Sequence, residues 1–451
     1  MKQTCLTIIL AAGEGTRMKS STPKVLHEVA GLPMVLHALN AAIEAGSDKS
    51  VVVVGAGADK VESRVLESDT SVSIAVQKER LGTAHAVLAA SEWLQKDFDD
   101  ILILYGDVPL IRSETLLNMR QQLRDGADVV VLGFEAKDPT GYGRLLEENG
   151  ELVAIREHKD ASVGEKRVCL CNSGIMIFNG SIAYETLQAI KNINSQSEYY
   201  LTDAVEVARS KGLKVVTTRA SEADVQGVNN RVQLAEVEAE WQRRKRNEMM
   251  LNGVSLVAPK TVTFAHDTVI GRDTVVEPHV VFRNNVDVAE NASILAFSYL
   301  EGSSIAEGCI VGPYARLRPG TVLLDNSKVG NFCEVKKSVV GVGSKINHLT
   351  YVGDTTIGVK SNIGAGTITC NYDGINKHPT KIGDNVFVGS NSSLIAPVEI
   401  GNNAIIAAGS VVTKDVPEDA LSIGRGKQVN KDKLAVKIRR RNASIMVKRK
   451  I

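Results

Sequence analysis

The sequence predicts two domains of different class: an α/β domain with a mostly parallel, Rossmann-like sheet, and an all-β domain folded as a left-handed parallel β-helix. Three observations lead to this prediction. The chain has 451 residues, which is too many for one ordinary core. Its first half alternates strand-like with helix-like segments. Its second half repeats an aliphatic residue at every sixth position.

Short, apolar and β-branched segments mark the candidate strands of the first half. They are residues 6–11, 50–54, 73–77, 101–104, 129–134, 174–178 and 214–217. Helical stretches separate several of them, for example 34–45 and 84–94. This alternation predicts a mostly parallel sheet with helices on both faces, and ligands at the carboxyl ends of its strands.

Between the two halves lies a highly charged, proline-free segment, residues 229–250, in which apolar residues recur at helical spacing. This pattern predicts one long connecting helix. We therefore expect the α/β domain at residues 1–228, and the β-helix with a C-terminal tail at residues 251–451.

The six-residue period of the second half holds over about twenty repeats, with occasional slips to five. Its apolar positions include Ile270, Val276, Phe282, Val288, Ile294 and Leu300, then Val311, Leu317, Leu323, Val329 and Val335, and later Ile382, Val388, Leu394, Ile400, Ile406 and Val412. A glycine often follows, as in Ile270-Gly271. We expect the aliphatic side chains inside a prism, one short strand per repeat, and coils of eighteen residues. Residues 364–381 break the period and predict a loop.

Composition excludes some classes of function. The formal net charge of +1 gives no global field that would attract nucleic acid or a membrane surface. The six cysteines lack the spacing of a zinc site or a disulfide framework, and no apolar run is long enough to span a bilayer. We expect a cytoplasmic enzyme. The basic C-terminal run, which includes Lys437, Arg439, Arg440 and Arg441, is either a solvated tail or a contact for phosphate or coenzyme A.

A glycine-bearing loop follows the first strand. It reads Leu10-Ala11-Ala12-Gly13-Glu14-Gly15-Thr16-Arg17-Met18 and is followed by Pro23-Lys24. Glycines at this place let backbone N–H groups approach phosphates, and Arg17 and Lys24 add positive charge. The loop matches neither the dinucleotide fingerprint nor the Walker A motif.

This loop resembles the fingerprint of the sugar-phosphate nucleotidyltransferases, and further matches follow in the order of that family. The resemblance implies that Arg17 and Lys24 are catalytic and that Asp107 and Asn229 bind Mg²⁺. The nucleotide-sugar contacts that it implies are Leu10, Ala11, Ala12, Gly13, Lys24, Gln77, Gly82, Thr83, Tyr105, Gly106, Asp107, Gly143, Glu157, Asn172 and Asn229. Among them, the resemblance assigns Gln77, Gly82 and Thr83 to the base and ribose, and Gly143, Glu157 and Asn172 to the sugar. Taken singly, Asp107 is equally compatible with a strand-end cap, Asn229 with the N-cap of the long helix, and Glu157 with a surface charge.

The second half carries its own motifs. They are Arg316-Leu317-Arg318-Pro319-Gly320, residues 331–337, residues 347–351, and the segment 362–374, which contains Cys370-Asn371-Tyr372-Asp373-Gly374. With the first half, they make the whole chain resemble the bacterial bifunctional family of N-acetylglucosamine-1-phosphate uridyltransferases and glucosamine-1-phosphate acetyltransferases.

Residue roles follow from this second resemblance. It implies that His348 is the general base, that Arg318, Lys336, Tyr351 and Asn362 bind the sugar phosphate, and that Ala365, Asn371, Tyr372, Ser390, Ala408 and Arg425 contact acetyl-CoA. A neutral histidine suits the removal of a proton from an attacking amine. We further expect backbone N–H groups of residues 364–366 to stabilise the oxyanion. Glu334 either orients His348 or pairs with Lys336. On an eighteen-residue coil, we also expect Lys336, His348 and Asn362 to lie on neighbouring faces of the prism.

The resemblance implies two-step synthesis of UDP-N-acetylglucosamine, a precursor of peptidoglycan and lipopolysaccharide. Glucosamine-1-phosphate, N-acetylglucosamine-1-phosphate, UTP and acetyl-CoA are the implied substrates, and a homotrimer is the implied assembly. Two alternatives stay open. One is a nucleotide-sugar pyrophosphorylase whose β-helix only oligomerises, and the other is a non-catalytic trimeric scaffold.

Overall fold

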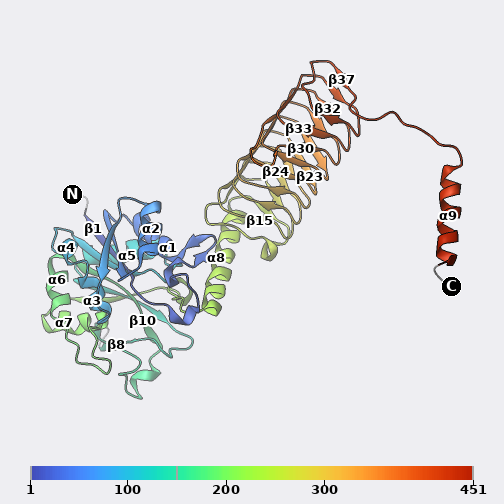
Figure 1. Ribbon diagram of the computed structural model, residues 1–451. Coiled ribbons are helices and arrows are strands. Elements are labelled where there is room, and N and C mark those ends of the chain that lie inside the picture. Colours follow the sequence, from blue (N-terminus) through green and yellow to red (C-terminus); the bar gives the residue numbers. More distant parts are fainter. Residues whose placement is uncertain (1–2, 149–150, 449–451) are drawn as a thin grey trace. The chain divides into compact units, whose positions relative to one another are not determined.

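The computed structural model describes residues 3–148 and 151–448 and divides into two compact units (Figure 1). The first unit contains the residues up to Glu248 together with Phe264–His266. The second contains Met249–Thr263 and the residues from Asp267 onward. Among the helices of the described residues, none is both long and apolar enough to cross a bilayer.

The first unit is built on one mixed sheet in the order β11-β7-β10-β6-β1-β4-β5. These strands are β1 (Cys5–Ala11), β4 (Lys49–Gly55), β5 (Ser73–Gln77), β6 (Asp100–Tyr105), β7 (Val129–Glu135), β10 (Leu170–Asn179) and β11 (Val215–Arg219). Strand β10 runs antiparallel to β6 and β7, and the other neighbours along this path are parallel. All seven predicted strands are present, and the mostly parallel sheet is confirmed.

Smaller elements complete this sheet. An antiparallel pair, β8 (Arg144–Glu148) and β9 (Glu151–Arg156), is attached through β10, and a second pair is formed by β2 (Glu28–Val29) and β3 (Leu32–Pro33). The sequence prediction contained neither pair, because their residues show no run of β-branched side chains comparable to those of the main strands.

Helices cover both faces of the sheet, and each face buries its own apolar core. One core takes side chains from α1 (Met34–Glu44), α2 (Asp59–Ser68) and α5 (Ser113–Arg124). The other takes them from α3 (Thr83–Leu88), α4 (Ser91–Leu94), α6 (Gly180–Gln188) and α7 (Ala204–Ser210). The single helix predicted at 84–94 is wrong, because the chain turns between α3 and α4. At this turn the Ala90 amide donates to the Val87 carbonyl, and Ala90 is fully buried.

Helix α8 (Arg231–Leu251) is the predicted long helix. Its residue Val237 is fully buried and packs with Met18, Val29 and Met34. Up to Glu248, this helix therefore shares a core with the first unit.

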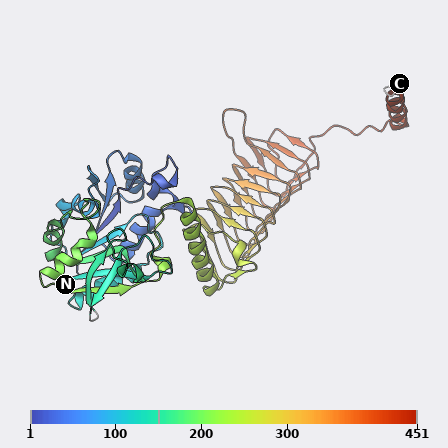
Figure 2. The ribbon, with the colours of Figure 1, turned by 90° about the horizontal axis from the view of Figure 1, so that it is seen from below.

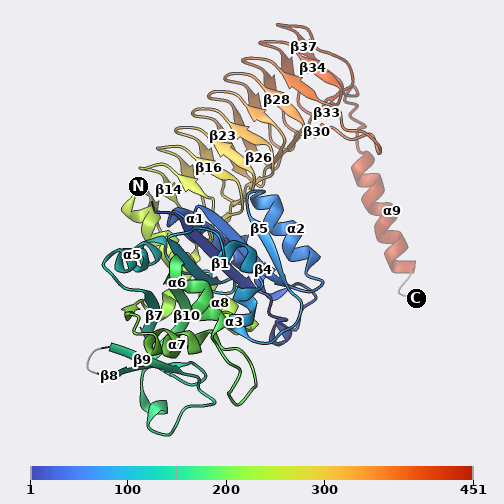
Figure 3. The ribbon, with the colours of Figure 1, turned by 90° about the vertical axis from the view of Figure 1, so that its left-hand side faces the viewer.

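The second unit is a left-handed parallel β-helix, and its coils are stacked as Figures 2 and 3 show. One sheet contains β12 (Ser255–Leu256), β14 (Val275–Val276), β17 (Ser293–Ile294), β20 (Ile310–Val311), β23 (Lys328–Asn331), β26 (Lys345–His348), β29 (Asn362–Ile363), β32 (Phe387–Val388), β35 (Ile405–Ile406) and β37 (Leu421–Ser422). Parallel hydrogen bonds join each strand to the next, so that residues far apart in the chain form straight columns.

The other two sheets are built in the same way. The second contains β13 (Val269–Ile270), β16 (Val286–Val288), β19 (Ser303–Ile305), β22 (Thr321–Leu323), β25 (Val339–Val340), β28 (Thr355–Ile357), β31 (Thr380–Ile382) and β34 (Val398–Ile400). The third contains β15 (Val281–Phe282), β18 (Tyr299–Leu300), β21 (Arg316–Leu317), β24 (Glu334–Lys336), β27 (Tyr351–Gly353), β30 (Ile368–Cys370), β33 (Ser393–Ile395) and β36 (Val411–Val412). The aliphatic residues of the predicted hexads are buried inside the prism.

Coil length differs from the prediction. Val275 pairs with Ser293, eighteen residues later, but Ser293 pairs with Ile310, only seventeen later. Asn362 pairs with Phe387, because the predicted loop lengthens that coil. Eighteen residues per coil therefore holds between β14 and β17, but not where the sequence slips to five or inserts the predicted loop, since corners of the prism accept such changes while the ladder of hydrogen bonds stays in register.

Helix α9 (Leu434–Lys448) follows the β-helix in the chain. Its side chains are exposed as far as Met446, including the basic Lys437, Arg439 and Arg440. The last basic residues of the predicted run, Arg449 and Lys450, lie outside the described residues.

Candidate active sites

The glycine-bearing loop of the first unit folds around Lys24. Gly15 has a φ of +66°, and a Cβ atom there would lie 2.5 Å from the Cβ of Lys24. A Cβ on Gly13 would come within 4.0 Å of the Lys24 Nζ. Leu10, at the end of β1, accepts a hydrogen bond from the Gly106 amide at 2.9 Å. The loop that contains Ala11 and Ala12 therefore lies beside the Tyr105-Gly106-Asp107 segment, as two adjacent parallel strands require.

The two predicted catalytic cations lie against the two predicted metal ligands. Lys24 Nζ forms a short ion pair with Asp107 Oδ2 and lies 3.4 Å from Asn229 Oδ1. Arg17 Nη2 donates to the same Asn229 Oδ1 at 2.8 Å. Val228 N donates to the Asp107 carbonyl at 2.9 Å and so fixes Asn229 beside the carboxylate. Four predicted residues from distant parts of the sequence thus converge.

Asn230, and not Asn229, caps the long helix. The Oδ1 of Asn230 accepts from Val232 N at 2.9 Å and from Gln233 N at 3.0 Å. This leaves the Asn229 side chain to face Arg17 and Lys24. The alternative in which Asn229 is only a helix cap is therefore wrong.

The oxygen atoms of Asp107 and Asn229 fit a small hard cation. The Asp107 carboxylate and the Asn229 amide oxygen both face the Lys24 ammonium group, and the amide oxygen also accepts from Arg17. Within the described ranges, no group of three or more His, Cys, Asp and Glu side chains forms a complete metal cage. Mg²⁺ suits such an incomplete site, because it retains water and phosphate oxygens beside one or two protein ligands.

The segment predicted to bind the base lies at the end of β5. Gln77 is buried, and its Nε2 donates to the Gly82 carbonyl at 3.2 Å. Gly82 has a φ of +116°, and a Cβ there would lie 2.4 Å from the Tyr199 carbonyl oxygen. Thr83 Oγ1 accepts from Leu201 N at 2.9 Å. These contacts hold the turn in one conformation.

The residues predicted to bind the sugar adjoin one another. Asn172 N donates to the Gly143 carbonyl at 2.8 Å, and a Cβ on Gly143 would lie 3.5 Å from Glu157 Oε1. Burial raises the pKa of Glu157, whose Oε1 accepts from Thr202 Oγ1 at 3.3 Å. Glu157 is therefore no free surface charge. In β10, Asn172 pairs with Gly133 of β7, and the register of the ladder shifts between Asn172 and Met176.

Tyr105 lies between the base and sugar segments. Its ring packs on Gly174, where a Cβ would lie 2.7 Å from Tyr105 Cε2, and its hydroxyl bonds the side chain of Thr83. Burial raises the pKa of Tyr105, so the phenol stays neutral. The residue thus joins two parts of the candidate site that are distant in the sequence.

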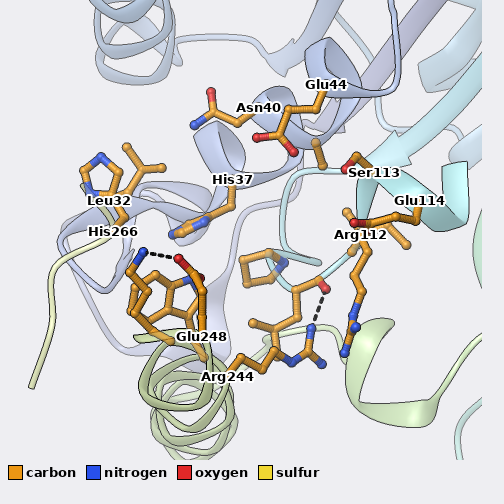
Figure 4. Close-up of a pocket in the computed structure, with 16 residues that line it drawn as sticks. Leu32, His37, Asn40, Glu44, Arg112, Ser113, Glu114, Arg244, Glu248 and His266 are labelled. Atoms are coloured by element: carbon orange, nitrogen blue, oxygen red, sulfur yellow. Dashed lines mark hydrogen bonds and ion pairs between the residues drawn. The ribbon is translucent and has the colours of Figure 1, made fainter. Parts of the chain in front are cut away.

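A separate cavity of about 440 Å³ lies elsewhere in the first unit (Figure 4). Its lining includes His37 and Trp241, and it contains none of the residues predicted from the sequence. Lys245 pairs with Glu248 at 2.8 Å, and Arg112 and Arg244 both pair with Asp224. Each of these three cations therefore has a carboxylate partner in the structure.

In the second unit, four of the predicted acetyl-transfer residues share one corner position. His348, Ala365, Ser390 and Ala408 each lie two residues after an inward aliphatic residue of the same sheet. The carbonyls of the first three accept from Gly366, Asn391 and Gly409 in the following coil. At the end of the column, Arg425 Nη1 donates to the Ala408 carbonyl at 2.8 Å. We give the name corner column to Asn331, which lies one coil earlier, together with His348, Ala365, Ser390, Ala408 and Arg425.

Asn331 is the hydrogen-bond partner of His348. The two residues are register partners, and His348 Nδ1 lies 2.5 Å from Asn331 Oδ1. Since an amide oxygen only accepts, this contact favours the tautomer of the neutral imidazole that carries its hydrogen on Nδ1 and its lone pair on Nε2. His348 is exposed, so Nε2 is accessible for proton transfer. Sequence reasoning assigned no role to Asn331, because its partner lies seventeen residues away in the chain.

Three of the four predicted sugar-phosphate residues belong to the adjacent sheet: Lys336 and Tyr351 lie in β24 and β27, and Arg318 directly follows β21. Arg318 Nη1 pairs with Glu334 Oε1 at 2.8 Å, and Arg316 Nη1 lies 3.5 Å from Glu334 Oε2. Both expected roles of Glu334 are therefore wrong, because β21 and β24 align it with arginines. The Lys377 ammonium group lies against Lys336 and lowers the pKa of Lys336. Sequence reasoning missed Lys377, which the loop brings back to the prism.

Gly353 leaves room for two predicted residues. A Cβ on Gly353 would lie 2.5 Å from the hydroxyl of Tyr351 and 2.8 Å from Asn371 Nδ2. Asn371 is buried and also donates to Asp354 Oδ2. Tyr372, the next residue, is exposed, and its hydroxyl donates to the Gly374 carbonyl within the loop. Tyr351 and Asn371 therefore meet although nineteen intervening residues separate them.

Two expectations for this site are wrong. The amides of Gly364 and Gly366 already donate to the carbonyls of Val388 and His348, so neither serves an oxyanion. Among the three predicted donors, only Ala365 N lacks an acceptor in the described part of the chain. Asn362 was expected on a face neighbouring that of His348, but β29 and β26 pair in the same sheet, and Asn362 Oδ1 lies 3.5 Å from Asn347 Nδ2.

Comparisons with known proteins agree with this division of the chain. Residues 7–168 match the MobA-like NTP transferase domain, and residues 379–414 match the bacterial transferase hexapeptide family of six repeats. The Bifunctional protein GlmU of Agrobacterium fabrum is 55% identical over 98% of this chain and 97% of its own length. Those of Bartonella quintana and Sinorhizobium medicae are 54% and 53% identical, covering 97% and 100% of this chain and 98% and 99% of their own lengths. The chain belongs to the family of bifunctional GlmU proteins.

Proposed function

We infer that this protein makes UDP-N-acetylglucosamine in two steps. The second unit transfers an acetyl group from acetyl-CoA to glucosamine-1-phosphate. The first unit then transfers a uridylyl group from UTP to N-acetylglucosamine-1-phosphate and releases pyrophosphate. The observation that carries the proposal is the convergence of Arg17, Lys24, Asp107 and Asn229 in one unit, and of His348 with the corner column in the other.

In uridylyl transfer, a phosphate oxygen of the sugar attacks the α-phosphorus of UTP, and the bond to pyrophosphate breaks. No proton transfer is required, so catalysis consists of positioning and charge neutralisation. Lys24 and Arg17 bind the phosphates, while Gln77, Glu157 and Asn172 orient the base and sugar. Mg²⁺, which Asp107 and Asn229 would hold, would neutralise negative charge on the triphosphate.

In acetyl transfer, the amine of glucosamine-1-phosphate attacks the thioester carbonyl. His348 Nε2 takes the proton of the amine, the carbon–sulfur bond breaks, and the proton passes to the coenzyme A thiolate. Arg318, Lys336 and Lys377 bind the sugar phosphate. Ala365, Ser390 and Ala408 expose small side chains along the corner, on which the extended arm of acetyl-CoA can lie.

A homotrimer is the assembly we propose for this β-helix. His279, Phe297, Tyr314 and Phe332 stack along one corner with ring centroids 4.8, 4.9 and 5.1 Å apart. Phe297 and Tyr314 are each 47% exposed and Phe332 is 55% exposed. Such a continuous aromatic stripe favours a protein contact. It leads directly to the corner column, since Phe332 follows Asn331, so a second copy would cover the acetyl-transfer site.

Light scattering tests this assembly and should give three times 48.4 kDa. Phe297→Lys combined with Phe332→Lys should yield monomers, whereas Val269→Lys, which charges an exposed valine on another sheet, should not. A wild-type monomer, or trimers that survive the double substitution, would contradict the assignment.

One assay with UTP, acetyl-CoA and glucosamine-1-phosphate tests the function. We expect release of coenzyme A, then of pyrophosphate, with UDP-N-acetylglucosamine as product. Pyrophosphate release from N-acetylglucosamine-1-phosphate without acetyl transfer would favour the single-activity pyrophosphorylase, and neither reaction would favour the scaffold. The proposal places the enzyme in the cytoplasm, a reducing compartment that suits its six unpaired cysteines, as a supplier of peptidoglycan and lipopolysaccharide precursors.

A further inference from the structure

Three cations in the first unit are held by oxygens that a triphosphate can replace. Lys24 is held by Asp107, and Arg17 by Asn229. The third is Arg80, whose Nη1 forms a short ion pair with Glu14 Oε1. Neither Arg80 nor Glu14 has a role in the site described so far.

Arg80 lies at the carboxyl edge of the sheet. A Cβ on Gly55, the last residue of β4, would lie 3.4 Å from Arg80 Nη2 and 3.2 Å from the Ala12 carbonyl oxygen. In the register of the sheet, Gly55 pairs with Gln77, and Val54 pairs with Ala11. The Arg80 guanidinium group therefore lies between the glycine-bearing loop and the segment predicted to bind the base.

The ion pair contributes little to the fold. The side chains of Arg80 and Glu14 are 49% and 58% exposed, and exposed pairs of this kind have small effects on stability. Both residues also belong to loops, so no helix or strand depends on their contact. A guanidinium group binds phosphate oxygens in two parallel hydrogen bonds, which a single carboxylate oxygen does not match.

We propose that Arg80 is a nucleotide-binding residue that exchanges the Glu14 carboxylate for the pyrophosphate end of UTP. Glu14 stands where phosphate oxygens will lie, and it keeps the guanidinium group in place until the nucleotide arrives. Arg17 and Lys24 both contact the side-chain oxygen of Asn229, so they lie at the predicted metal ligands. Arg80 pairs with Glu14 instead, and we therefore assign it to the pyrophosphate end of UTP. This inference rests on the proposed uridylyl transfer.

Substitution of each partner separately distinguishes exchange from a structural contact. Arg80→Ala should raise the calorimetric Kd and the KM for UTP about 10- to 100-fold, as expected for loss of a charged hydrogen bond. Glu14→Gln should lower both about two- to fivefold, because it removes a competing and repelling carboxylate. A merely structural pair would give the same sign for both variants, since either substitution breaks it.

The controls use neighbouring groups and shorter ligands. Lys78→Ala removes an exposed positive charge two residues away and should leave UTP binding unchanged. Binding of UMP, which lacks the pyrophosphate end, should be nearly equal in all variants, and melting temperatures should agree with the wild type. Changes of the same sign for Arg80→Ala and Glu14→Gln, no change in either, or equal effects on UMP would overturn the proposal. A wild-type protein that binds UTP without uridylyl transfer would instead contradict the proposed function.

Discussion

In the α/β unit, the candidate site is assembled from loops at the ends of different strands, whereas in the β-helix it is assembled from one corner repeated along consecutive coils. Arg17, Asp107 and Asn229 meet because parallel strands end at the same edge of the sheet. His348 and Ala408 share a column because backbone ladders hold successive coils in register. The first arrangement depends on packing between loops, and the second depends on repetition.

The two arrangements should differ in how far the structural effect of a substitution spreads to neighbouring residues. In the loop-built site, the position of one residue commonly depends on another, as Lys24 depends on the space that Gly15 leaves by having no side chain. In the corner column, the backbone is fixed by the ladder, so a side chain can be removed without moving its neighbours. We therefore expect effects that spread through the first site and effects that stay local in the second.

The largest effect should come from Asp107→Ala. Loss of the carboxylate that would hold Mg²⁺ should lower uridylyl transfer by about 10³-fold or more, because neutralisation of the charge on the triphosphate dominates catalysis of this reaction. Acetyl transfer, measured as release of coenzyme A, should stay near the wild-type rate. If both activities fell together in folded protein, the comparison of two independent sites would be wrong.

His348→Ala should lower acetyl transfer by about 10²- to 10⁴-fold, the usual effect of losing a general base. The melting temperature should change little, because the side chain is exposed and the ladder supports its backbone. Uridylyl transfer serves as the internal control. A folded variant with near wild-type acetyl transfer would remove the assignment of His348 as base.

Asn331→Ala sharpens the same point. Without its partner, His348 can rotate and exchange tautomers, so acetyl transfer should fall by about 10-fold, as for residues that orient a functional histidine. Asn385→Ala, which removes an exposed asparagine that donates to Asn403 away from the candidate site, is the matched control. Equal losses in the two variants would show that Asn331 acts only through packing.

Gly15→Ala tests the dependence of one loop residue on another. The positive φ and the contact with Lys24 should together lower the free energy of unfolding by about 2–4 kcal/mol and impair uridylyl transfer. Gly57 has a similar φ of +75° but nothing within 4 Å, so Gly57→Ala should cost only about 1 kcal/mol. Chemical denaturation measures both, and equal losses would exclude the contact as the cause.

The smallest effect concerns Asp203. Burial, with Glu206 and Glu157 adding to it, raises the pKa of Asp203 to about 6. Because this pKa lies above that of the unfolded chain, the contribution of Asp203 to stability is present at acidic pH and is lost as the pH rises through 6. Asp203→Asn should therefore raise the melting temperature by about 2–4 °C at pH 7 and leave it unchanged near pH 4.

Asp138 is the matched control with the opposite sign. Hydrogen bonds from Thr140 lower the pKa of Asp138, so its stabilising contribution is present above the pKa of the unfolded chain. Asp138→Asn should not raise the melting temperature at pH 7. A rise in both variants would point to net charge and not to burial of Asp203.

Local patterns allowed the fold to be predicted, and contacts distant in the sequence limited the prediction of the sites. Runs of β-branched residues identify β1 and β4, and the six-residue period identifies the prism, because each depends on adjacent residues. The capping role of Asn230 and the partnership of Asn331 with His348 depend instead on hydrogen bonds that single motifs do not reveal. Glu334 was misassigned for the same reason, since its arginine partners are determined by strand register.

The stacked coils also act as a ruler. Strands that pair by backbone hydrogen bonds are about 4.8 Å apart, so each coil advances the corner column by one step of that length. The distance from His348 to the carbonyl held by Arg425 is therefore set by a whole number of coils and is independent of side-chain size. Deleting one complete coil between them would shorten this distance by a single step. The extended ligand that fits along the corner would then have to be shorter by the same length.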